Sequence, residues 1–108
     1  MAATAMLVLT TCSDTEAADS LADRLVSARL AACVNRIDKV VSTYRWQDAV
    51  HRDPEVLLLI KTTEARLDAV AKAIREASSY ELPEFVAVRV DTGAPAYLAW
   101  LAEAVTGS

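Results

Sequence analysis

The chain has 108 residues, 54% of them hydrophobic, with only two Gly and three Pro, which predicts one compact domain over residues 1–108, ordered from about 5 to 105. Eleven Lys and Arg against fifteen Asp and Glu give a net charge of −4, which disfavours a nucleic-acid partner. The opening MAATAMLVLTTC has no basic stretch, and its apolar run is too short for a membrane span, so we expect a cytoplasmic protein without a membrane partner.

The first two elements are a strand and a helix. The apolar, β-branched run Met6 to Thr11 predicts a strand. Ser13 with Glu16 three residues later has the form of a capping box, which predicts the start of a helix. Apolar residues then recur at three- and four-residue spacing from Ala18 to Leu25, so this helix has one core-facing side.

The middle of the chain is rich in β-branched and aromatic residues and predicts a hairpin. A first strand covers Cys33 to Trp46, with a bend or bulge at the polar pair 38–39 and a turn at 47–49. The next apolar run, Val56 to Ile60, is unbroken, which is typical of a central strand covered on both faces.

The remaining elements repeat the first two and add a terminal helix. Thr63 can cap a helix whose apolar stripe runs from Leu67 to Ala77. Pro83 opens a strand that continues to Val90, and Pro95 begins a short C-terminal helix. The order predicts an α+β fold, a ferredoxin-like βαββαβ sandwich with a long middle hairpin and an extra C-terminal helix.

The middle hairpin is long for a domain of this size. A continuous strand from Cys33 to Trp46 would span roughly 45 Å, whereas a domain of about 100 residues is roughly 35 Å across. Part of the hairpin should therefore protrude and expose apolar side chains and unpaired backbone unless another chain covers them. We expect a homo-oligomer, provided that the bend at 38–39 does not fold the hairpin back onto its own domain.

Chemistry-bearing residues are few. Cys12 and Cys33 are expected as free thiols in a reducing compartment, and Cys33, flanked by apolar residues, is either a small buried hydrophobe or a metal ligand. His51 is the only histidine and stands in a polar stretch. No Ser/His/Asp or Cys/His set and no Gly-rich phosphate loop is present, so we expect no enzyme activity and no catalytic residues.

A group of aromatic and charged residues is a candidate for a cleft. It consists of Tyr44, Arg45, Trp46, Lys61, Tyr80, Glu81 and Glu84. Tyr and Trp in apolar and charged company are typical both of subunit interfaces and of ligand clefts, and both interpretations remain open. Trp100, on the terminal helix, belongs either to a flap over one sheet face or to a subunit junction.

Six strings of the sequence resemble one known family. They are LVLTTCSD (7–14), RLAACVN (29–35), YRW (44–46), EVLLLIKT (55–62), YELPE (80–84) and AYLAWL (96–101). In this order and with matching gaps, they are similar to the CutA divalent-cation tolerance family from about Met6 to Val105. The resemblance implies a homotrimer in which the hairpins pair between subunits, a cytoplasmic location, and a link to tolerance of copper and other divalent metals.

The same resemblance bears on a metal site. Some family members are assigned copper ligands at positions that hold Thr10, Ala77 and Ser78 here, so those ligands are absent from this chain. Cys33, with Cys12 as a second thiol, is the remaining candidate for Cu²⁺ or another divalent cation, and no cofactor is required. The resemblance also implies kinship with trimeric PII signalling proteins, so a module that binds a small anion through Lys61 and Arg45, or a structural trimer that anchors other proteins, is an alternative.

Overall fold

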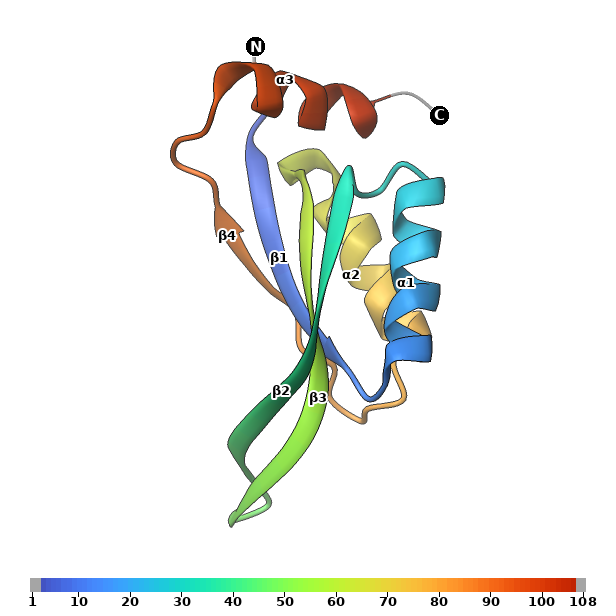
Figure 1. The fold of residues 1–108 in the computed structure, drawn as a ribbon, viewed down its shortest axis with the longest axis vertical. Helices are drawn as coiled ribbons and strands as arrows, with labels where there is room; N and C mark the ends of the chain where they lie inside the picture. Colours follow the sequence, from blue (N-terminus) through green and yellow to red (C-terminus); the bar gives the residue numbers. More distant parts are fainter. Residues whose placement is uncertain (1–2, 107–108) are drawn as a thin grey trace.

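The computed structural model describes residues 3–106, so the ends of the domain expected over 1–108 lie outside the described residues. The elements follow in the order β1 (Ala5–Cys12), α1 (Thr15–Ser27), β2 (Cys33–Trp46), β3 (Ala49–Thr63), the 3-10 turn η1 (Glu64–Arg66), α2 (Leu67–Ala77), β4 (Val86–Arg89) and α3 (Pro95–Ala104) (Figure 1).

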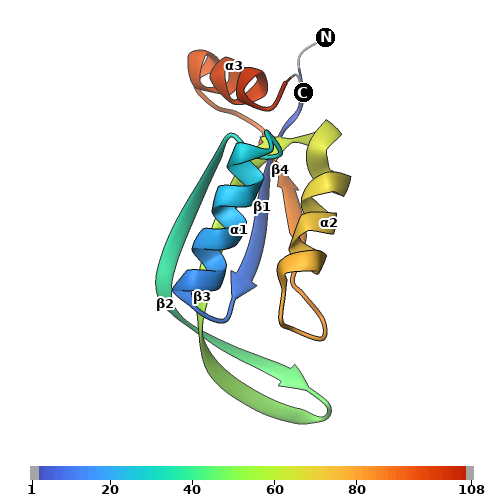
Figure 2. The ribbon, with the colours of Figure 1, turned by 90° about the vertical axis from the view of Figure 1, so that its right-hand side faces the viewer.

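The four strands form one antiparallel sheet with the order β2-β3-β1-β4. Helices α1 and α2 stand on one side of this sheet, and α3 lies across the end of the sheet far from the hairpin tip (Figures 1 and 2). The expected α+β, ferredoxin-like arrangement with a long β2–β3 hairpin and an extra terminal helix is confirmed.

The core lies between the sheet and the two helices. Alternate residues of β1 and β3, among them Val8, Leu58 and Ile60, point into it and meet buried side chains of α1 and α2 such as Leu25 and Ile74. Because burial of this apolar surface fixes which face of each strand points toward the helices, it also fixes which side chains lie on the opposite face.

The opposite face of the sheet carries no helix layer. In β3 the exposure alternates from Val56 to Thr62, so a single chain covers only one face of this strand, and the expected cover on both faces is not provided within one chain. The strand also runs well beyond the expected Val56–Ile60, because its N-terminal half pairs with β2 in the hairpin. We call this side the open face. The pairing register places on it Leu7, Leu9, Ile37, Leu57, Leu59, Val86 and Val88, together with Thr11, Cys33, Asn35 and Lys61.

The hairpin is bent by a bulge where one was expected. The β2–β3 register shifts between Ile37 and Val40, and Lys39 has a φ of 59°, in the left-handed region that marks the irregularity. Arg36 ties this point to α1 through its Nη1, which lies 2.7 Å from Asp19 Oδ2, and also contacts Asp38. Beyond the bulge, residues 40–55 form what we call the arm.

The arm protrudes as expected. The molecule measures 46 × 25 × 22 Å, and the arm extends away from the helices along the longest axis (Figure 1). Its tip is a two-residue turn in which Gln47 and Asp48 have φ values of 51° and 64°. Positive φ at both central residues belongs to the type I′ turn, whose twist matches that of a hairpin.

Three local expectations differ from the structure. The N-cap of α1 is Asp14 rather than Ser13, because Asp14 Oδ1 accepts the Ala17 N–H at 2.8 Å. Thr63 is buried and makes no side-chain cap, and η1 intervenes before α2. The last strand is only Val86–Arg89, because Pro83 lacks an N–H for the ladder and residues 83–85 instead form a loop beside the end of β1.

Candidate functional site

A groove of about 630 Å³ lies between the arm and the loop that joins α2 to β4. The strand β2 contributes one wall and the loop 80–84 the other. The lining residues are Thr11, Ser42, Thr43, Tyr44, Arg45, Trp46, Glu55, Tyr80, Glu81, Leu82 and Glu84. Its size is in the usual range for small-molecule sites.

Two tyrosines of the groove are held by carboxylates. The Tyr80 hydroxyl donates to Glu55 Oε2 at 2.7 Å and so joins the loop to the root of the arm. The Tyr44 hydroxyl donates to Asp53 across the arm, and its ring stacks on His51 with 5.5 Å between ring centroids. Burial, the hydrogen bond to Glu55 and the charge of Glu55 raise the pKa of Tyr80, so its hydroxyl remains a donor at physiological pH.

Glu84 combines a fixed backbone with a side chain whose pKa is raised. Its backbone carbonyl accepts a 2.6 Å hydrogen bond from the buried Thr10 hydroxyl, which fixes the loop against β1. Burial, and then repulsion from Glu55, raise the pKa of its side chain. The negative charge of Glu55 thus disfavours a second negative charge on Glu84.

The positions of the family's copper ligands gather in a second, much smaller pocket. Its volume is about 20 Å³, and Thr10, Cys12, Ala77 and Ser78 are among its lining residues. Two hydroxyls and a methyl group are poor partners for a soft ion, and the Thr10 hydroxyl already donates to Glu84. Burial, Asp14 and Glu55 raise the pKa of the Cys12 thiol, which disfavours the thiolate that a metal needs. These residues do not fit a copper ion.

The two cysteines do not form a common site in one chain. Cys33 pairs with Lys61 and Cys12 with Val56, so they are separated by five positions, about 17 Å, along β3. Both thiols are free and half-buried. Over residues 3–106, no group of three or more His, Cys, Asp or Glu side chains could hold a metal ion.

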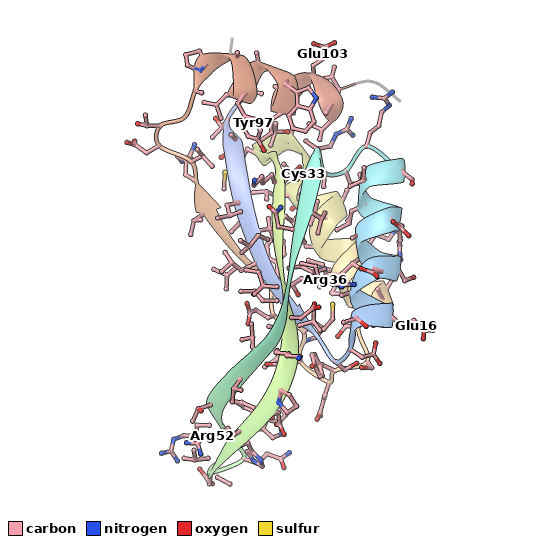
Figure 3. All side chains as sticks on the ribbon, in the orientation of Figure 1. Glu16, Cys33, Arg36, Arg52, Tyr97 and Glu103 are labelled. Atoms are coloured by element: carbon pink, nitrogen blue, oxygen red, sulfur yellow. The ribbon has the colours of Figure 1, made fainter. Side chains whose placement is uncertain are left out.

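The far end of β3 carries a separate cluster. Lys61 Nζ lies 3.3 Å from the Tyr97 hydroxyl and 5.6 Å from the centre of its ring. Trp100 packs against Tyr97 with 5.4 Å between the ring centroids. Figure 3 shows Tyr97 near Cys33 at this end, with Arg52 at the opposite end in the arm.

The residues expected to form one cleft thus divide into two places. Tyr44, Arg45, Trp46, Tyr80, Glu81 and Glu84 line a single groove, whereas Lys61 lies beside Tyr97 of α3. Cys33, the expected metal ligand, pairs with Lys61 at the same end, and Trp100 is part of α3. Arg45 pairs with Val50, eleven positions or about 36 Å of strand from Lys61. One chain therefore does not combine Lys61 and Arg45 in a single anion site.

Sequence reasoning missed Glu55 in the groove, Asp53 as the partner of the Tyr44 hydroxyl, and Tyr97 beside Lys61. Glu55 could have been found from alternation, since it precedes the buried Val56 and so faces the other way, toward the side of Tyr44. Asp53 carries the same signal, since it lies two positions before Glu55 and pairs with Ser42, two positions from Tyr44. Tyr97 carries no such signal, because its contact with Lys61 depends on the position of α3.

No helix within residues 3–106 combines the length and the apolar character that crossing a membrane requires.

Comparison with known proteins gives a consistent result. The sequence profile of the family described as CutA1 divalent ion tolerance protein matches residues 6–104. The divalent-cation tolerance protein CutA of Thermus thermophilus is 41% identical over 97 residues, which cover 90% of this chain and 94% of that protein. The mouse protein CutA is 38% identical over 91 residues, 84% of this chain, and this chain spans 51% of its length. The solved structure of CutA1 from Oryza sativa superposes with a TM-score of 0.94 at 36% identity, covering 99% of this chain and 98% of that one.

Proposed function

The chain belongs to the CutA1 divalent ion tolerance family, and on that premise we propose that it works as a non-catalytic homotrimer in the response to copper and other divalent cations. The observation that carries this proposal is the uncovered, apolar open face of the sheet. The number of three chains follows the family resemblance.

The open face has the composition of a surface that another chain covers. Ile37, Val86 and Val88 are 43%, 50% and 46% exposed, and the leucines of β1 and β3 on the same face are half-exposed. Soluble monomers rarely leave a continuous apolar patch of this kind in water. A second copy of the chain offers the same apolar surface, so association through this face removes both patches from water.

The arm supports the same proposal. Beyond the bulge, β2 and β3 pair only with each other in the described residues, and an isolated two-stranded ribbon is marginally stable in water. The outer edge of β2 presents unpaired backbone groups. Contact with a neighbouring subunit would stabilise the ribbon and provide hydrogen-bond partners for the backbone groups of that edge.

Any metal site belongs, in this proposal, between subunits. The residues at the family's copper positions do not fit the ion, and Cys12 is held as a thiol. Cys33 lies on the open face, since it pairs with Lys61, so association could bring Cys33 side chains of several copies within reach of one ion. Thiolate sulfur is a soft ligand that selects Cu(I), so copper would be held at this site as Cu(I).

Native mass spectrometry under anaerobic conditions tests the metal part of the proposal. We expect the assembled protein to take up copper stepwise when one equivalent per chain is added. Cys33→Ser should abolish uptake, whereas the matched variant Cys12→Ser should keep it. Absence of uptake by the wild type, or uptake that survives Cys33→Ser, would contradict a shared Cys33 site.

We also propose a cytoplasmic location, in keeping with two free cysteines. A rice relative is named as a chloroplastic protein, and a solved relative from Archaeoglobus fulgidus is described as periplasmic, so compartments differ within the family. Fractionation of the source cells with antibody detection tests the location: signal in the cytoplasmic fraction is expected, and signal confined to an envelope or organelle fraction would contradict it.

A further inference from the structure

The charged side chains that line the groove between the arm and the loop 80–84 favour a cationic ligand over an anionic one. Glu55, Glu81 and Glu84 line it together with a single cationic side chain, Arg45. Glu55 and Glu84 repel each other, and a cation placed between them would relieve that repulsion. An anionic ligand would meet three carboxylates and one guanidinium, so the groove disfavours it.

The walls of the groove distinguish an organic cation from a metal ion. Tyr44, Trp46 and Tyr80 supply aromatic surface, and the faces of such rings attract weakly hydrated cations. The hydroxyls of Tyr44 and Tyr80 are bonded to Asp53 and Glu55, which holds both rings in place without a ligand. A divalent ion needs several oxygen ligands converging on one point, and the carboxylates of residues 3–106 do not converge in that way. A volume of about 630 Å³ is also far larger than an ion requires.

We propose that the groove lined by Tyr44, Trp46, Tyr80, Glu55 and Glu84 binds a small organic cation, an amine or amidine carried on an apolar body. The cationic head lies between Glu55 and Glu84, and the apolar body lies against the aromatic side chains of the groove. This inference does not rest on the proposed metal response, and it assigns the groove a ligand of its own.

Binding of benzamidinium to the assembled, metal-free protein tests the proposal. The chain has two tryptophans, Trp46 and Trp100, so Trp100→Phe leaves Trp46 as the only indole reporter. We expect benzamidinium to change the Trp46 fluorescence with a Kd on the order of 1 mM. The neutral isostere benzamide should bind roughly ten-fold more weakly, and benzoate should not bind.

Variants locate the site. Glu84→Gln keeps the shape of the side chain and the backbone bond to Thr10, and it should weaken benzamidinium binding roughly five-fold. Glu103→Gln, an exposed change on α3, is the matched control and should leave binding unchanged. Calorimetry on each variant reports binding independently of fluorescence, and its melting temperature reports folding.

Three results would overturn the proposal. One is equal affinity for benzamide and benzamidinium, which would make the groove merely apolar. Another is an unchanged affinity in Glu84→Gln. The third is no binding up to roughly ten times the expected Kd, which would mean that the groove of the assembled protein is filled by a second copy. Copper uptake is measured separately, so failure here leaves the proposed metal response untouched.

Discussion

At the scale of single residues, Thr10 shows how a buried polar group can connect two distant segments. The hydroxyl is 1% exposed and donates to the carbonyl of Glu84, 74 positions later in the chain. The bond closes the loop 78–85 over the end of β1, and that loop forms one wall of the groove. A residue at a position linked with metal binding in the family is thus used here to fix the groove.

Replacing Thr10 by Val should destabilise the protein. The valine has nearly the same shape, but it leaves the Glu84 carbonyl without its donor, which costs about 1–3 kcal/mol in the free energy of unfolding. Chemical denaturation measures the loss. The control Thr11→Val changes a half-exposed neighbour on the other face of β1 and should shift stability by less than about 0.5 kcal/mol. Equal effects of the two variants would contradict the role given to the Thr10 bond.

Glu84 should make stability fall as pH rises. Its pKa in the folded protein is raised above the ordinary 4.5, so between pH 4.5 and the raised pKa the folded protein binds more protons than the unfolded chain. We expect Glu84→Gln to melt at a higher temperature than the wild type above this window and at the same temperature below pH 4.5. Melting curves across the pH range check this.

The pKa of Glu76 is shifted in the opposite direction, so this residue serves as a comparison for Glu84. The hydrogen bond from Arg24 lowers its pKa, so its stabilising effect is present above pH 4.5 and is lost as pH falls through the lowered value. Glu76→Gln should therefore lower the melting temperature near neutral pH and not in strong acid. A Glu84→Gln variant that behaved like Glu76→Gln would contradict the account of the groove.

At the scale of elements, the turn of the arm carries the clearest strain. Gln47 and Asp48 both have positive φ, a conformation that costs residues with a side chain and that Asn-Gly adopts readily. The double change Gln47→Asn with Asp48→Gly should raise the free energy of unfolding by about 1 kcal/mol. Thermal unfolding measures this effect. Gln47→Val, a β-branched residue at the same φ, should lower stability, and a reversed order of the two variants would contradict the turn assignment.

Elements with a local chemical signal could be predicted from the sequence. Two polar residues, Asp38 and Lys39, interrupt an apolar run and so predict the bulge that the register shows there. Pro95 stands at the start of α3, where its fixed φ is favourable. The N-cap of α1 could not be assigned from pattern alone, because Ser13 and Asp14 are both good caps. The length of β3 depends on its pairing with β2, and pairing is not contained in a single run of residues.

The residues of the candidate site could also be predicted only in part from the sequence. Tyr44, Trp46 and Tyr80 were expected in one cleft and do line one groove. Lys61 was expected with them and lies near α3 instead, because the register pairs it with Leu7 and Cys33, in the half of β3 away from the arm. Residue types indicated what kind of site to expect, whereas the register of the sheet determined which residues share it.

At the scale of the whole molecule, the open face should decide the state of assembly. Val88 is 46% exposed on β4, and a lysine there would place a charge within the apolar patch. We expect Val88→Lys to shift the assembly toward single chains, as measured by light scattering after size-exclusion chromatography. Val26→Lys is a matched control, since Val26 is 44% exposed on α1, away from the open face. Loss of assembly in both variants, or in neither, would contradict the assignment of the interface.

The most direct test is the mass of the purified wild-type protein, without metal, by native mass spectrometry. One chain has a mass of 11.6 kDa. We expect a species of three times that mass, 34.8 kDa, because the open face and the outer edge of β2 need to be covered by other copies. A species of 11.6 kDa at micromolar concentration would contradict the account, since the apolar sheet face would then be stable in water without a partner.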